Sequence, residues 1–359
     1  MEKKGALGRI KSTFIGDRAF YQSVVKLLIP IVIQQGITSF VNLLDNVMVG
    51  ALSTAAISGV AIVNQLIFVF NLSIFGSLSG PSIYSAQYAG VGDDEGVKHC
   101  FRFKMIIGTL ISVAAVLVFA LFGENLIWLY LNEEVNTAET LAATLEQAKD
   151  YMYVMLWGLP PFMLSQAYGT TLRETGETVV PMQASIISIV TNCVLNYALI
   201  YGKFGAPAMG VKGAAIATVI ARYLEIAYIL IHTYRRLDKY HYFRGALRNL
   251  KIPKELVKKI AVTGAPLLAN EFLWSTAMAV KNQCFSYRGL AVVAATNITS
   301  TVWQVFAIIM FAMGSAIAIM VGQQLGTGDI EEARRTDARL IFVSFVVHVL
   351  IGILVVALS

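Results

Sequence analysis

Two stretches far apart in the chain read alike: QYAGVGDDEGVKH at residues 87–99 and QQLGTGDIEEARR at residues 323–335 (323 − 87 = 236). The leading glutamine, two glycines, an aspartate and a glutamate fall at matching positions. At the same offset upstream, Pro30 matches Pro266. The register does not slip between these points, so the pattern indicates an internal repeat and not two unrelated helical hairpins.

The composition indicates a membrane protein. Of the 359 residues, 57% are hydrophobic and 14% are charged, and the mean hydropathy is +0.66. Soluble domains carry about 25% charged residues, so this chain has too few to cover a surface that faces water. The three cysteines are too few and too scattered for a disulfide framework or a metal site.

Runs of about 20 apolar residues, the length that crosses a hydrocarbon core, recur along the chain. We predict nine transmembrane helices, at residues 24–48, 56–86, 101–123, 150–170, 180–201, 213–234, 258–284, 291–323 and 340–358. The second and the eighth are longer than one span requires, so we expect them to tilt or to project beyond the bilayer.

The distribution of Lys and Arg predicts the orientation of these helices. Of the 28 Lys and Arg residues, 22 lie in the N-terminal segment as far as Lys26 or in alternate loops and the helix ends beside them, and nine of these lie from Arg235 to Lys259. We therefore expect a multi-pass protein of the cell membrane with a cytoplasmic N-terminus, in contact with the lipid bilayer. The net charge of +6 reflects this orientation, and no nucleic-acid partner is expected.

The offset of 236 residues spans six predicted helices, an even number, so both copies should face the same way as a parallel repeat. We predict an all-α polytopic membrane protein with nine transmembrane helices of a twelve-helix, two-lobe architecture. The expected parts are a cytoplasmic arm (1–23), a six-helix lobe (24–234), a basic cytoplasmic linker (235–257) and the first three helices of a second lobe (258–359). The last three helices of that lobe would be missing.

The glycine-rich turns do not match a phosphate-binding loop, because no strand precedes them and no G-K-[ST] follows. We interpret them as tight cytoplasmic turns. Glycine would supply the positive φ, and Asp93 or Asp329 would cap the helix that follows.

Asp45 stands in the apolar run VNLLDNVMVG (residues 41–50). An ionisable group within a membrane helix costs about 2.5–3.5 kcal/mol, so it should face a wet cavity or a polar partner. Asn192, Asn196 and Thr218 are predicted to lie at the same depth on two later helices. Ordinary hydrogen bonding between helices is the alternative role for these three side chains.

The seventh predicted helix holds a second group of polar residues. Glu271 falls near its middle, beside Asn270 and one turn before Trp274. Lys281 occupies the position equivalent to Asp45 and carries the opposite charge. Either it has a role at that position, or its side chain snorkels to the outer surface. Either Glu271 binds a proton or cation, or a neighbouring residue neutralises it.

Several of these stretches carry a resemblance to a known family. They are IPIVIQQGITSFVNLLDNVMVG, SAQYAGVGDDEGVKH, RETGETVVPMQ, TNCVLNYALIYG, GVKGAAIATVIA and VGQQLGTGDIEEARR. Together they resemble the multidrug and toxic compound extrusion (MATE) family of transporters, from about residue 20 to the end of the chain. The resemblance implies two six-helix lobes around a cavity and export of bulky, often cationic compounds against protons or sodium ions.

The resemblance also implies roles for single residues. Asp45 matches a coupling residue of the first lobe, and Asn192 and Thr218 resemble members of its hydrogen-bonded group. Asn196 replaces an aspartate of some members, which weakens a proton mechanism borrowed from them. Glu271 is similar to a cation-site glutamate of the second lobe. Lys281 has no match.

We therefore predict a secondary active multidrug exporter that works by alternating access, as a monomer and without a cofactor other than the coupling ion, H⁺ or Na⁺. The expected ion-coupling residues are Asp45, Asn192, Asn196, Thr218 and Glu271, with Asp45 and Glu271 as the candidate sodium ligands. The expected substrate contacts are Asp45, Gln34, Gln35, Asn270, Trp274 and Lys281.

Other functions remain open at this stage. The first alternative is a flippase for lipid-linked oligosaccharides, although only Arg222 stands inside a predicted span. A second is that this short form is inactive. An enzyme is not expected, because the four histidines lie apart and neither H-E-x-x-H nor G-x-S-x-G occurs.

Overall fold

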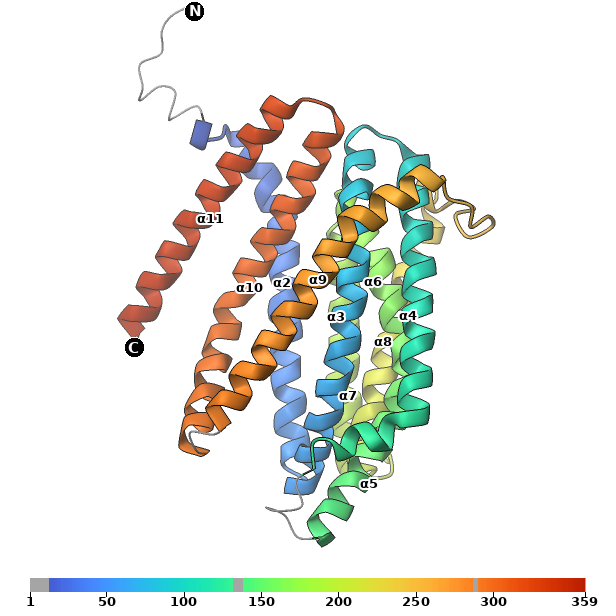
Figure 1. Ribbon diagram of the computed structural model, residues 1–359, viewed down its shortest axis with the longest axis vertical. Coiled ribbons are helices and arrows are strands. Elements are labelled where there is room, and N and C mark those ends of the chain that lie inside the picture. Colours follow the sequence, from blue (N-terminus) through green and yellow to red (C-terminus); the bar gives the residue numbers. More distant parts are fainter. Residues whose placement is uncertain (1–12, 132–137, 287–289, 359) are drawn as a thin grey trace, which may run out of the picture.

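The computed structural model describes residues 13–131, 138–286 and 290–358, and this part of the chain is built of helices and turns (Figure 1). Some side chains within the helices, among them those of residues 41–47 and 282–302, lie outside the description. The helices are α2 (Arg18–Gly50), α3 (Thr54–Gly90), α4 (Asp94–Trp128), α5 (Ala138–Met155), η1 (Leu156–Gly158), α6 (Leu159–Glu174), α7 (Val179–Tyr201), α8 (Gly210–Arg235), η2 (His241–Phe243), α9 (Lys254–Ser286), α10 (Leu290–Gly326) and α11 (Ile330–Leu358).

The helix boundaries repeat at the offset found in the sequence. Both ends of α9 lie 236 residues after the ends of α2, and the same holds for α10 and α3. The starts of α11 and α4 are related in the same way. Equivalent helices run in the same direction, as a parallel repeat requires (Figure 1).

The predicted spans all fall on helices. Seven described helices are long and apolar enough to cross a membrane, namely α2, α3, α4, α7, α8, α10 and α11. The long second and eighth spans correspond to α3 and α10, each of 37 residues. The remaining two predicted spans, 150–170 and 258–284, fall on α5 with α6 and on α9.

The prediction of one helix over residues 150–170 was wrong. α5 ends at Met155, the turn η1 follows, and α6 begins at Leu159. Pro160 and Pro161 stand in the first turn of α6. Proline lacks an amide donor and is tolerated at the start of a helix but not inside it, which explains the break.

The two repeated turns have the predicted chemistry. Gly92 and Gly328 have φ of 72° and 81°. The carboxylates of Asp93 and Asp329 each accept a hydrogen bond of 2.9 Å from the backbone N–H three residues later. With the Asp93 cap, α4 begins at Asp94, which is seven residues before the predicted boundary at residue 101 (101 − 94 = 7).

The halves of the repeat pack through equivalent pairs of helices. Helix α2 contacts α10. The repeat-related contact joins α9, the equivalent of α2, to α3, the equivalent of α10. In the first pair, Leu27 and Ile31 pack on Ala312 and Ala316. In the second, a Cβ on Gly80 would lie 2.9 Å from the Cα of Gly264. Small residues therefore let the two lobes approach closely.

The tightest contact joins α3 to α10 at the end of the molecule that carries the turns 91–93 and 327–329, which we name the basic end. A Cβ on Gly90 would lie 1.9 Å from the carbonyl oxygen of Gln323. A Cβ on Gly326 would lie 1.9 Å from the carbonyl oxygen of Gln87. The two contacts are related by the repeat, so the lobes meet backbone to backbone there.

The first lobe holds a buried ion pair near the basic end. Lys104, near the start of the predicted helix 101–123, is on α4 and is fully buried. Its Nζ donates to the two carboxylate oxygens of Glu174 at 2.7 and 2.6 Å, and to the hydroxyls of Thr170 and Thr171 at 3.1 and 3.2 Å. The backbone carbonyl of Glu174 also accepts a bond of 2.6 Å from Gln323 of α10.

The segment between the lobes is packed against the first lobe. Its Lys239 forms an ion pair of 2.5 Å with Glu177, between α6 and α7. Burial alone would raise the pKa of Glu177, but the hydrogen bonds and positive charge of Lys239 hold it below its usual value. This ion pair ties the predicted linker to the first lobe.

We expect Lys104→Met to destabilise the protein strongly, because it leaves the Glu174 carboxylate buried and unpaired. Breaking one partner of a buried pair costs about 3–5 kcal/mol. The double variant Lys104→Met/Glu174→Met should recover much of this loss. Thermal unfolding of the purified protein in detergent measures both effects, and equal unfolding midpoints for the single variant and the native chain would contradict the prediction.

Candidate functional site

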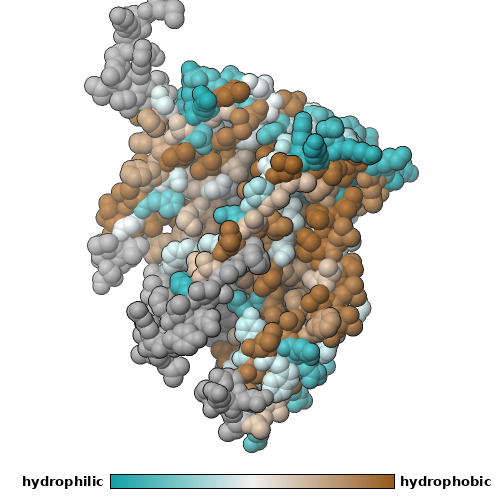
Figure 2. All heavy atoms as spheres, in the orientation of Figure 1, coloured by the Kyte–Doolittle hydropathy of each residue, from teal (hydrophilic) through white to brown (hydrophobic). Residues whose placement is uncertain are grey.

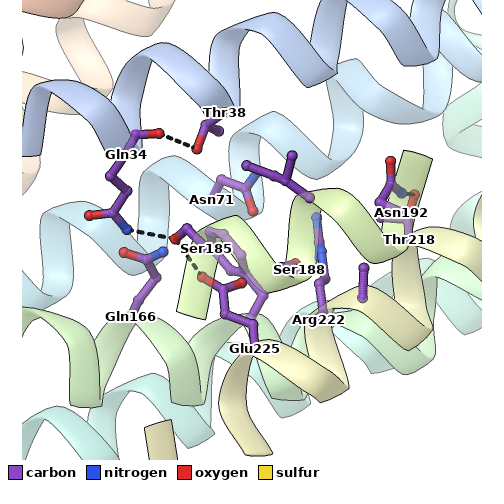
Figure 3. Close-up of a pocket in the computed structure, with 13 residues that line it drawn as sticks. Gln34, Thr38, Asn71, Gln166, Ser185, Ser188, Asn192, Thr218, Arg222 and Glu225 are labelled. Atoms are coloured by element: carbon purple, nitrogen blue, oxygen red, sulfur yellow. Dashed lines mark hydrogen bonds between the residues drawn. The ribbon is translucent and has the colours of Figure 1, made fainter. Parts of the chain in front are cut away.

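A polar cavity lies inside the first lobe, between α2, α3, α6, α7 and α8 (Figure 3). Its volume is about 260 Å³. The lining residues are Gln34, Thr38, Asn71, Phe162, Gln166, Ser185, Ser188, Ile189, Asn192, Thr218, Ala221, Arg222 and Glu225. We refer to it as the lobe cavity.

A second cavity of about 680 Å³ lies between the two lobes. It is lined from α2, α3 and α6 on one side and from α10, through residues such as Met310 and Ser315, on the other. Both cavities are lined by Gln34, Thr38, Asn71, Phe162 and Gln166, so they adjoin. We refer to the second as the interlobe cavity. Together they offer the space that drug-sized ligands occupy, about 300–1,000 Å³.

A chain of hydrogen bonds crosses the region where the cavities meet (Figure 3). Arg173 Nη1 donates to Gln34 Oε1 at 3.1 Å. Gln34 Nε2 donates to Ser185 Oγ at 2.8 Å, and Ser185 Oγ donates to Glu225 Oε1 at 3.0 Å. The chain links a cation to an anion through two neutral groups and fixes the rotamer of each member.

A second arginine faces the same space without pairing with the glutamate. Arg222 Nη1 donates to the carbonyl oxygen of Gly158 at 3.0 Å, and its guanidinium lies 4.9 Å from the centre of the Phe162 ring. Among the described residues, Glu225 forms no ion pair. The carboxylate therefore keeps acceptor capacity that a ligand can use.

Helical spacing brings these side chains together. On α8, Thr218, Arg222 and Glu225 are separated by four and three residues, so they share one face. On α7, Ser185 and Asn192 are two turns apart and share another. The two faces point at each other, and both line the lobe cavity.

Three of the predicted coupling residues are in contact. Asn192 Nδ2 donates to Thr218 Oγ1 at 3.1 Å, and Asn196 Nδ2 donates to Asn192 Oδ1 at 3.0 Å. Both asparagines are buried. Asp45 is on α2, but its side chain lies outside the described residues. The role of all four in ion coupling stays a prediction.

The predicted substrate contacts divide into two groups. Gln34 lines both cavities and Gln35 lines the interlobe cavity. Asn270, Trp274 and Lys281 are exposed on α9, and none of the three lines either cavity.

Glu271 also lies on α9 and outside both cavities. Its Cγ would be 3.7 Å from a Cβ placed on Gly76 of α3, so it packs at the contact between the lobes. No cluster of three or more His, Cys, Asp or Glu side chains that could hold a metal ion occurs in the described parts of the chain. Sodium binding at Glu271 or Asp45 stays a prediction.

Sequence reasoning missed Glu225, the one described carboxylate that lines the lobe cavity. The signal was available, because Glu225 stands in the apolar run ARYLEIAYIL just as Asp45 stands in its own run. Gln166 and Ser185 were missed for another reason. Neutral polar residues are common in membrane helices, and only their position in the fold distinguishes them.

The family model MatE matches residues 30–198 and 266–359. The two matched segments correspond to the two copies of the repeat.

Curated relatives are similar over most of the chain. A probable multidrug resistance protein NorM of Thermotoga maritima is 26% identical over 335 residues, which are 93% of this chain and 69% of the relative. The multidrug resistance protein MdtK of Edwardsiella ictaluri is 26% identical over 87% of this chain and 66% of its own length. The chain is thus shorter than the relatives that it matches.

Solved structures share the fold. An outward-facing multidrug resistance MATE family transporter of the MOP superfamily superposes with a TM-score of 0.80, at 21% identity, over 95% of this chain and 73% of that chain. A MATE structure in a bent conformation gives a TM-score of 0.79. With the family model matching more than half of its residues, this chain belongs to the MatE family of membrane transporters.

Proposed function

We propose that the protein is a secondary active exporter of bulky, often cationic compounds, driven by inward movement of H⁺ or Na⁺. The observation that carries the proposal is the pair of adjoining cavities, one inside the first lobe and one between the lobes, lined with both charged and apolar side chains. The names of relatives such as NorM and MdtK, which are multidrug resistance proteins, support the substrate class.

In this proposal the substrate occupies the interlobe cavity. Phe68, Phe75 and Phe311 would contact its apolar body, and Gln34 and Gln35 would accept or donate hydrogen bonds. A cationic group would reach toward Glu225 in the lobe cavity. The coupling ion competes with the substrate for the carboxylates of Asp45 and Glu225. Asn192, Asn196 and Thr218 would assist Asp45 in binding the ion. Such coupling has to be reciprocal between ion and substrate.

Movement of one cation across 100 mV supplies about 2.3 kcal/mol, to which the concentration gradient adds. To use it, the lobes have to open alternately to the two sides of the membrane. The contacts of Gly90 with Gln323 and of Gly326 with Gln87 close the basic end, which we take to be cytoplasmic in the cell membrane. The access route from that side would form when these contacts separate.

A flippase for lipid-linked oligosaccharides is the second candidate. The observation that favours it is that Arg173 and Arg222 both line the cavities, where they could bind a pyrophosphate. Flipping of a fluorescent lipid-linked pyrophosphate by vesicles of the protein, without uptake of ethidium, would favour this candidate over multidrug export.

The central test is ethidium efflux from a drug-sensitive host that expresses the chain. We expect Glu225→Gln and Asp45→Asn each to lower efflux about tenfold or more, because each removes a charge-assisted interaction worth about 1.5–3 kcal/mol. Glu139→Gln, on the exposed surface of α5, is the control and should export normally. Undiminished efflux by the Asp45 and Glu225 variants at equal expression would remove these carboxylates from the mechanism.

The coupling ion is tested in vesicles. If sodium drives export, an imposed inward Na⁺ gradient at constant pH should support ethidium transport, and a proton gradient without Na⁺ should not. Transport with a proton gradient alone, and none with a Na⁺ gradient at constant pH, would identify H⁺ as the coupling ion. Equal transport with neither gradient would contradict secondary active coupling.

We expect Gly90→Ala to shift the protein away from the state closed at the basic end. Close carbon–oxygen contacts lie at about 3.3–3.6 Å, so a methyl group at 1.9 Å from the Gln323 oxygen has to push the lobes apart. Spin labels at the equivalent turn positions Val91 and Thr327 should report a longer distance in the variant. Gly352→Ala, where a Cβ has nothing within 4 Å, should leave the distance unchanged.

A further inference from the structure

The segment between the lobes forms a pocket at the basic end that no transport step uses. Its volume is about 570 Å³. It is lined by Tyr234 at the end of α8 and by the continuous run Phe243–Arg248. We refer to it as the connector pocket.

Buried aromatic side chains hold the wall of this pocket in place. Phe243 is buried, with its ring 4.9 Å from that of Phe101 on α4 and 5.0 Å from that of Tyr168 on α6. Tyr168 in turn has its hydroxyl 3.2 Å from that of Tyr234. The pocket is therefore anchored to three membrane helices.

Hydrogen bonds to backbone carbonyl groups hold the loop itself. Arg102 Nε of α4 donates to the carbonyl oxygen of Ala246 at 2.8 Å. Gly245 adopts a φ of 64°, and within this turn the N–H of Arg248 donates to the carbonyl of Gly245 at 3.2 Å. The chain turns so that Arg244 and Arg248 both line the pocket.

These two arginines carry charge that the protein does not neutralise. Both side chains are exposed, and neither forms an ion pair with a carboxylate of the described residues. The neighbouring carboxylates Asp94 and Glu177 are bound instead to His241 and Lys239. A guanidinium prefers a planar pair of oxygens, as on a phosphate.

The position of the pocket favours the phosphate of a lipid over free phosphate. Helix α8, one of those long and apolar enough to cross a membrane, ends at Arg235, so the pocket lies at the end of a candidate membrane span. Exposed Tyr234, Leu247 and Leu250 add apolar surface beside the two arginines. Figure 2 shows hydrophilic residues gathered at this end of the molecule and hydrophobic residues on the flank below it. A ligand here would meet water at one end and lipid tails at the other.

We propose that the connector pocket binds the phosphodiester headgroup of an anionic phospholipid. Arg244 and Arg248 hold the phosphate oxygens, and Tyr234 and Leu247 contact the glycerol and the first carbons of the acyl chains. Basic pockets beside membrane helices are suited to such headgroups. The lipid would tie the segment between the lobes to the bilayer surface.

Native mass spectrometry of the purified chain tests this. Delipidated protein is incubated with phosphatidylglycerol, with phosphatidylcholine or with inorganic phosphate, and retained ligand is counted. We expect retention of phosphatidylglycerol and a fall of about tenfold or more in Arg244→Gln/Arg248→Gln, since two basic contacts are lost. Arg244→Lys/Arg248→Lys should retain less lipid than the native chain and more than the glutamine variant, because it keeps the charge and loses the planar pair of donors.

The matched control Lys258→Gln/Arg334→Gln removes the same charge from exposed residues of α9 and α11 at the same end and should bind as the native chain does. Size-exclusion profiles confirm that every variant is folded. Unchanged retention in the glutamine variant, an equal loss in the control, or displacement of the lipid by millimolar inorganic phosphate would each overturn the proposal.

Discussion

Hydrocarbon offers no hydrogen-bond partner to a peptide group, and this constraint governs the whole molecule. It forces the chain into helices whose backbone bonds are internal, and it drives polar side chains toward one another. The chain from Arg173 through Gln34 and Ser185 to Glu225 is one result. The buried pair of Lys104 and Glu174 is another. Both lie in the interior of the first lobe, away from lipid.

The second lobe meets the first through small residues, because lipid-facing helices gain little by burying large apolar side chains against each other. The closest approaches are Gly80 to Gly264, and the pair of repeat-related contacts, Gly90 to Gln323 and Gly326 to Gln87. The last pair lies at the basic end, whereas the interlobe cavity is lined by the middle turns of α3 and α10. An alternating-access transporter needs a tight contact between the lobes at its closed end and a cavity next to that contact. The contact at the basic end and the interlobe cavity have this arrangement.

The charges inside the cavities have both signs. Glu225 suits a cationic substrate, whereas Arg173 and Arg222 suit carboxylate or phosphate groups. Each arginine donates to a neutral acceptor of the protein, and Glu225 accepts from Ser185, so all three keep capacity for a ligand. In the proposed function, the names of the relatives, which are multidrug resistance proteins, rank drug export above oligosaccharide flipping.

Periodicity and repetition in the sequence determined the fold. The offset of 236 residues predicted the parallel repeat, and the glycine turns and aspartate caps between its helices could be predicted because they act locally. Asn192 and Thr218 could be paired from helix depth alone. The break after Met155 and the burial of Lys104 depended on packing, and the sequence did not reveal them. Glu225 joined the site only in three dimensions, because a cavity is formed by the faces of several helices and no single helix encodes which faces will meet.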